Sequence, residues 1–116
     1  MPDSAEEIAR EWLVKSVLAD GERWSALDEA PYNDPELTWQ GILAVLLHEL
    51  SPEQFALLAA GPLETLLSRY GPDYIERVER EAAQNPKFNY LLGGVWRCLA
   101  VKDVWDRVQT ARKKTW

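Results

Sequence analysis

The amino-acid sequence predicts a single all-α domain, and three observations lead to this prediction. Apolar residues recur at helical spacing in nearly every segment, and no segment shows the alternation typical of a strand. Capping residues, prolines and glycines stand at the ends of these segments. The length of 116 residues suits one domain with one hydrophobic core. We expect six or seven helices over residues 1–116, packed as a bundle or as an irregular stack of helical hairpins.

Two strong helices are predicted in the N-terminal half, with a shorter helical piece between them. The first begins at a capping box formed by Ser4 and Glu7 and ends before Gly21. The second begins at Asn33 or Asp34, with Pro35 in its first turn, and its apolar face extends to Leu50.

Glycine and proline divide the C-terminal half into shorter helices. Ser51 and Pro52 predict an N-cap and first turn. Gly61-Pro62 and Gly71-Pro72 each predict the end of one helix and the start of the next, and Asn85-Pro86 predicts a further boundary. The last helix is expected to follow Gly93-Gly94 directly.

Charge is distributed unevenly along the chain. The net charge is −6, with eleven acids and three bases in residues 1–50 and eight acids and ten bases in residues 51–116. An acidic half suits a basic protein partner. The short basic cluster from Arg107 to Lys114 does not make the concentrated basic face typical of nucleic-acid binding. Binding of nucleic acid through this cluster is therefore only an alternative.

The predicted location is cytoplasmic. The single cysteine cannot form an internal disulfide, the acidic N-terminal residues do not resemble a secretory signal, and no apolar run reaches about 18 residues. We therefore expect no membrane association.

Residues that carry catalysis or bind metals are scarce, and we predict no catalytic residue, no metal ligand and no cofactor. His48 is the only histidine, and the sequence spacing places no catalytic partner on the same helix face as His48. Cys98 shares a predicted helix face with Val101 and Trp105, which favours a buried core thiol. Spacings typical of zinc, calcium or phosphate sites are absent.

Six tryptophans make the composition unusual. Trp12, Trp39 and Trp105 fall on apolar stripes and are expected in the core. Trp24 stands among polar residues, and aromatic residues in such surroundings often anchor protein interfaces. Trp116 is expected to fold back onto the domain. The predicted partner-binding residues combine these aromatics with nearby acids: Trp24, Asp28, Glu29, Tyr32, Asp34 and Glu36.

Two blocks of sequence resemble an uncharacterised bacterial family, domain of unknown function 6869. The first block is LLAAGPLE at residues 57–64, and the second comprises NPKF at residues 85–88 and LLGGVW at residues 91–96. The resemblance covers about residues 35–97 and implies a small helical bacterial protein. It implies no activity, so no catalytic residue is carried over. Glu64 is the one signature residue for which a capping role or a partner contact is open.

The function that the sequence favours is a non-enzymatic protein-binding module. The specific form expected is an immunity-type protein that neutralises a basic toxin or effector. Three alternatives are an inhibitor of a host nuclease encoded by a phage or mobile element, a small ligand-binding or enzymatic helical domain, and a nucleic-acid binder that uses the basic C-terminal residues. The sequence does not indicate the oligomeric state.

Overall fold

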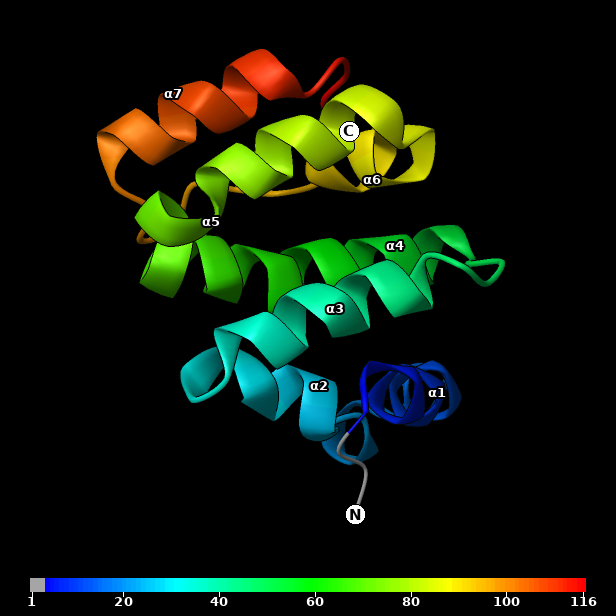
Figure 1. Cartoon of the computed structure of the whole chain (residues 1–116). Coiled ribbons are helices and arrows are strands. Elements are labelled where there is room, and N and C mark those ends of the chain that lie inside the picture. Colours follow the sequence, from blue (N-terminus) through cyan, green and yellow to red (C-terminus); the bar gives the residue numbers. More distant parts are fainter. Residues whose placement is uncertain (1–3) are drawn as a thin grey trace.

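Seven α-helices contain most of the regular structure of residues 4–116, which are the residues that the computed structural model describes (Figure 1). These residues contain no strand, so the all-α prediction is confirmed. Three short helical turns, η1 (Asp20–Glu22), η2 (Ala30–Tyr32) and η3 (Ala59–Leu63), lie between the α-helices. The α-helices are α1 (Ala5–Lys15), α2 (Ala26–Glu29), α3 (Pro35–Val45), α4 (Pro52–Leu58), α5 (Glu64–Gln84), α6 (Pro86–Leu92) and α7 (Lys102–Ala111).

Predicted caps begin three of the helices, and a fourth cap lies at the predicted boundary Asn85-Pro86. Ser4 Oγ accepts the Glu7 amide at 3.1 Å at the start of α1, and an Asp34 carboxylate oxygen accepts the Leu37 amide at 3.1 Å at the start of α3. Ser51 caps α4 in a capping box, and Asn85 caps α6. Each such cap contributes about 1 kcal/mol, because it satisfies an amide that has no partner within the helix.

The end of α3 comes earlier than its apolar pattern predicts. The helix ends at Val45, and the Leu47 side chain is 86% exposed. Lys87 Nζ donates to the carbonyl oxygens of Leu46 at 2.6 Å and His48 at 2.7 Å. A cation at a helix C-terminus satisfies carbonyl groups that lack intrahelical partners. This contact, which a residue 41 positions away supplies, stabilises the earlier end.

The Gly61-Pro62 pair does not separate two helices, which corrects the sequence prediction. Pro62 has no amide hydrogen for an α-helical bond, and the chain widens into a π-helical turn at η3. The Glu64 amide donates to the Ala59 carbonyl there, so α4 continues into α5. Gly71-Pro72 lies within the range of α5, but Tyr70 has a non-helical backbone (φ −132°, ψ 19°). Two helical segments of α5 therefore meet at a kink there, as the sequence predicts.

The last helix begins later than predicted, and Cys98 is not a core thiol. Residues 95–101 form an irregular segment, and α7 begins only at Lys102. Cys98 is exposed and has a left-handed backbone (φ 47°). A core helix would bury Cys98 with Val101, but Val101 is itself exposed and precedes the helix.

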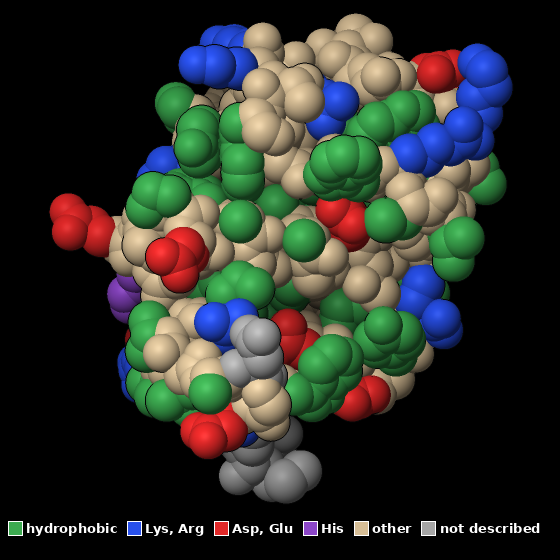
Figure 2. Space-filling view, turned by 180° about the vertical axis from the view of Figure 1, so that it is seen from behind, with side chains coloured by type: hydrophobic (Ala, Val, Ile, Leu, Met, Phe, Trp, Pro, Cys, Tyr) green, Lys and Arg blue, Asp and Glu red, His purple; other side chains and the backbone are tan. Residues whose placement is uncertain are grey.

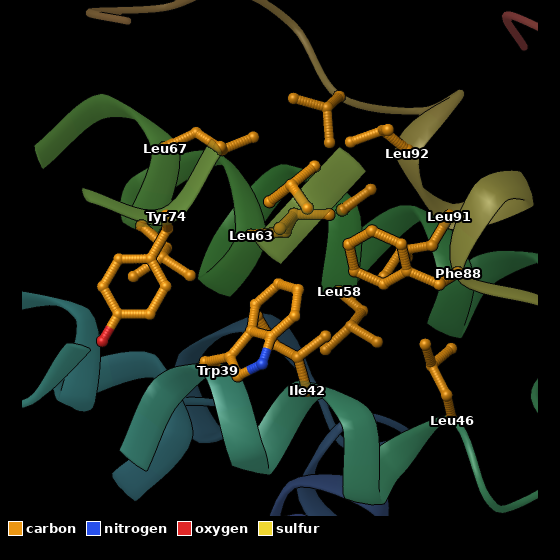
Figure 3. Close-up of a cluster of buried hydrophobic side chains, with 14 of the residues drawn as sticks. Trp39, Ile42, Leu46, Leu58, Leu63, Leu67, Tyr74, Phe88, Leu91 and Leu92 are labelled. Carbon is orange, nitrogen blue, oxygen red and sulfur yellow. The ribbon is translucent and has the colours of Figure 1, made fainter. Parts of the chain in front are cut away.

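The hydrophobic core lies where α3 faces α5 and α6 (Figure 3). The Trp39 ring from α3 lies 6.2 Å from the Tyr74 ring of α5 and 5.4 Å from the Phe88 ring of α6, centroid to centroid. Figure 1 shows α1 and α2 on one side of α3, and α6 and α7 on the opposite side of the molecule. Trp39 therefore connects helices from both halves of the chain.

The tryptophans predicted for the core differ in burial. Trp12 and Trp39 are buried, while Trp105 on α7 is only half-buried. Trp116 folds back as expected, and its ring stacks on Tyr90 with the centroids 5.2 Å apart. The chain near its C-terminus therefore returns to α6, as Figure 1 also shows.

Candidate interaction surface

Three of the six predicted partner-binding residues have roles within the fold. Asp28 accepts the Ser25 amide at 2.9 Å, which closes the capping box of α2, and burial raises the pKa of its carboxyl group. Asp34 caps α3. Glu36 binds Arg77 through two hydrogen bonds of 2.5 and 2.9 Å, which hold the pKa of Glu36 at about 2.

The other three residues present their side chains to solvent. Trp24 is 58% exposed, and its indole Nε1 donates to a carboxylate oxygen of Glu29 at 3.0 Å. Tyr32 is 45% exposed, and the Arg69 guanidinium carbon lies 5.1 Å from its ring centroid. Each exposed aromatic ring is thus fixed by a charged neighbour, an arrangement that lowers the entropic cost of binding.

A shallow groove begins beside Tyr32. One cavity of about 270 Å³ is lined by Tyr32, Ala60, Glu64, Thr65, Ser68, Arg69, Cys98 and Leu99. A second, of about 350 Å³, is lined by Arg23, Glu53, Ala56, Leu57 and Ala60. Ala60 lines both cavities, so they are neighbours, and we call the two together the Ala60 groove. The rear view of the molecule shows hydrophobic side chains at the surface with acidic and basic ones between them (Figure 2).

Glu64 forms part of the floor of the Ala60 groove. It is 8% exposed, and its carboxylate accepts the Trp96 amide at 3.0 Å and the Cys98 thiol at 2.8 Å. The hydrogen bond to Glu64 raises the pKa of Cys98, with desolvation contributing next. The π-helical turn places Glu64 at the start of α5, from which it holds residues 95–101 against the helix. Glu64 therefore has a structural role within the fold.

Sequence reasoning missed part of this surface. Leu99 is 83% exposed and Trp96 is 75% exposed, and both lie in the irregular segment that was expected to be helical. A signal was present, because six of the seven residues 95–101 are apolar and they do not repeat at helical spacing. Arg69 carried no signal, since its contact with Tyr32 joins distant parts of the chain.

The chain was compared with protein families, curated proteins and solved structures. A family of unknown function, DUF6869, matches residues 15–116. The chain belongs to this family. The match includes α7 and the residues after it, so it is wider than the resemblance over residues 35–97. No curated protein and no solved structure matches.

The DUF6869 signature residues have structural roles in this chain. Pro62 sets the π-helical turn, Glu64 holds the irregular segment, and Gly93 and Gly94 lie directly against Trp116. Within residues 4–116, no group of three or more His, Cys, Asp or Glu side chains is placed to hold a metal ion. No helix in the same range is long and apolar enough to cross a bilayer.

Proposed function

We propose that this DUF6869 protein is a non-enzymatic module that binds another protein through Trp24, Glu29, Tyr32 and the adjoining Ala60 groove. The observation that carries the proposal is the exposure of two aromatic rings that are already held in place by Glu29 and Arg69. Aromatic anchors of this kind dominate binding energy at protein interfaces. The groove offers an apolar floor at Ala60 and Leu57 for side chains of the partner.

The chemistry of the groove supports a binding role over a catalytic one. A nucleophilic cysteine needs a lowered pKa, whereas the carboxylate of Glu64 raises the pKa of Cys98. His48 is exposed in the turn after α3, and within residues 4–116 only its backbone forms a hydrogen bond. A histidine base for Cys98 is therefore not part of our proposal.

The specific form that we favour is an immunity-type protein that covers a basic toxin or effector. The charge balance of −8 in residues 1–50 supports this form, because this part of the chain contains eleven acidic residues and only three basic ones. Ion pairs with Arg10, Lys15 and Arg77 occupy Glu6, Glu11 and Glu36. Glu29 and Asp34 are exposed and in no ion pair within residues 4–116, and they adjoin the aromatic anchors.

The test uses a purified candidate partner, the product of the gene beside this one, in titration calorimetry with the full chain. We expect Trp24→Ala with Tyr32→Ala to raise the Kd by about tenfold or more, which is typical of the loss of anchor residues. Leu47→Ala is the matched control, because Leu47 is an exposed apolar residue in the turn after α3. Unchanged affinity of the double variant would contradict the proposed surface.

A further inference from the structure

A second hollow lies at the C-terminal end of the chain, and three indole rings line it. We call it the indole pocket. Its volume is about 290 Å³, and it is lined by backbone and side-chain atoms that include those of Trp96, Arg97, Trp105, Arg112, Thr115 and Trp116. An apolar cavity of about 150 Å³ holds one benzene molecule, so this volume has room for an aromatic ring system with a polar substituent.

Contacts within the fold hold two of the indole walls in place. The Trp116 amide donates to the Gly93 carbonyl at 3.0 Å, and its indole Nε1 donates to the Tyr90 carbonyl at 2.5 Å. The Arg112 guanidinium lies over the Trp105 ring, 4.9 Å from the centroid. Trp96 is mostly exposed and forms the outer wall. The pocket is therefore formed before any ligand binds, which reduces the cost of binding.

The two arginines give the indole pocket a positive charge. Arg112 donates to the Val95 carbonyl at 3.0 Å, and Arg97 Nε donates to the Ala100 carbonyl at 3.2 Å. Neither guanidinium forms an ion pair within residues 4–116, and no acidic residue is among those that line the pocket. Desolvation lowers the pKa of Arg112. Most N–H donors of each guanidinium therefore stay available.

We propose that the indole pocket binds a small aromatic carboxylate, with the ring between the tryptophans and the carboxylate on Arg112 and Arg97. Offset or edge contacts with indole rings favour a flat apolar body. Guanidinium groups match the geometry of a carboxylate and form hydrogen bonds of the stronger, charge-assisted kind. A cationic ring would also suit the indole faces, but the two guanidinium groups would repel it. This proposal stands independently of the protein-binding surface around Trp24.

The experiment uses 2-naphthoate as the probe for the full chain. Six indole N–H signals report on the six tryptophans in an amide NMR spectrum. We expect saturable binding with a Kd of about 1 mM or tighter, and shifts at the indole signals of Trp96, Trp105 and Trp116 but not Trp24. The cationic analogue 2-naphthylmethylammonium should bind at least about tenfold more weakly, as expected when charged hydrogen bonds are replaced by repulsion.

Two variants separate recognition of the carboxylate from damage to the pocket. Arg112→Gln should weaken 2-naphthoate binding by about tenfold, the loss expected for a charged hydrogen bond. Because Arg112 also supports Trp105, the exposed Arg97→Gln is the second variant, and it should weaken binding while leaving the indole spectrum of the free protein unchanged. Arg80→Gln, another exposed arginine, is the matched control and should bind as the parent does.

Three results would overturn the assignment. The first is the absence of saturable shifts with 2-naphthoate, and the second is equal affinity for the cationic analogue. The third is binding that neither Arg97→Gln nor Arg112→Gln weakens. Adenosine monophosphate is titrated in parallel, and tighter binding of this nucleotide than of 2-naphthoate would also overturn the assignment, in favour of a nucleotide site.

Discussion

At the scale of single residues, Gly93 and Gly94 matter for the space that they leave open. Neither has a left-handed backbone, so the usual reason for glycine at a helix end does not apply. A Cβ atom at Gly93 would lie 2.1 Å from the Lys114 carbonyl oxygen, and one at Gly94 would lie 2.4 Å from the Trp116 ring. The missing side chains let the C-terminal residues lie directly on the end of α6.

We predict that Gly93→Ala destabilises the protein by about 1–3 kcal/mol, the usual cost of overpacking. The reason is that the added Cβ atom would clash with the backbone oxygen of Lys114. A backbone atom cannot relieve the clash by changing rotamer, as a side chain could. Urea unfolding measures the change in the free energy of unfolding. Gly21→Ala is the control, because a Cβ atom there would meet nothing within 4 Å. Equal unfolding midpoints for Gly93→Ala and the parent protein would refute the prediction.

The Glu36–Arg77 pair predicts a pH dependence of stability. Hydrogen bonds from Arg77 lower the pKa of Glu36 from 4.5 to about 2. A carboxyl group whose pKa is lower in the folded state stabilises that state above pH 4.5, and the contribution is lost as the pH falls towards 2. Because the Glu36 side chain is 47% exposed, solvent screening limits the contribution to about 1 kcal/mol.

The measurement compares Glu36→Gln with the parent protein by urea unfolding between pH 7 and pH 2. We expect the variant to be less stable near neutral pH and the difference to vanish near pH 2. Glu6→Gln is the control, since Glu6 pairs with Arg10 within one exposed helix face and should give a smaller difference. If the difference in the free energy of unfolding between Glu36→Gln and the parent protein does not change with pH, the charge of Glu36 is not the cause of that difference.

At the scale of elements, one carboxylate connects α5 to the irregular segment before α7. Glu64 accepts both the Trp96 amide and the Cys98 thiol. Glu64→Gln removes the negative charge, so we expect the pKa of Cys98 to fall and the thiol to react about threefold to tenfold faster with a disulfide reagent near pH 8. Glu64→Ala also removes the hydrogen-bond acceptor, so hydrogen exchange at the Trp96 amide should accelerate.

Glu79→Gln is the control for this prediction, because Glu79 pairs with Arg107 on α7. It should leave the reactivity of Cys98 unchanged. A thiol that reacts at the parent rate in Glu64→Gln would mean that Glu64 does not control Cys98.

The elements also show which parts of the fold the sequence could predict. Helix starts were predicted correctly at Ser4, Asp34 and Ser51, and the boundary at Asn85 was also predicted, because each cap acts within a few residues. The end of α3 and the joint at Gly61-Pro62 were not predicted correctly, although the joint at Gly71-Pro72 was. The end of α3 depends on distant Lys87, and a proline can either begin a helix or sit in a π-helical turn. Local patterns do not distinguish these outcomes.

At the scale of the whole molecule, the candidate sites differ in how far the sequence could predict them. The polar neighbours of Trp24 made it a candidate for the surface without deciding its exposure, and the structure shows that it is exposed. The indole pocket could not be predicted, because it forms only when Trp116 returns to α6 and Arg112 covers Trp105. The surface around Trp24 and Tyr32 also depends on Arg69, which is distant in sequence, whereas the indole pocket is built from residues 93–116 alone.

The arrangement of the core predicts cooperative unfolding of the whole chain. Trp39 on α3 contacts aromatic rings of α5 and α6, and one cluster of buried side chains includes residues from α1 to α7. The radius of gyration is 13.0 Å, as expected for one domain of about this length. Neither half of the chain can lose its structure without exposing apolar surface of the other, so partly folded states should be unstable.

We therefore expect urea to unfold the protein in one transition, with tryptophan fluorescence and far-ultraviolet circular dichroism giving the same midpoint. The dependence of the free energy on urea should be about 1–3 kcal/mol per molar, as for other small domains. Trp39→Phe, which removes one fluorophore from the centre of the core, should shift both midpoints together because both probes follow the same transition. Two separate midpoints would instead mean that α1–α3 and α5–α7 unfold independently, and that the contacts of Trp39 do not couple the two halves.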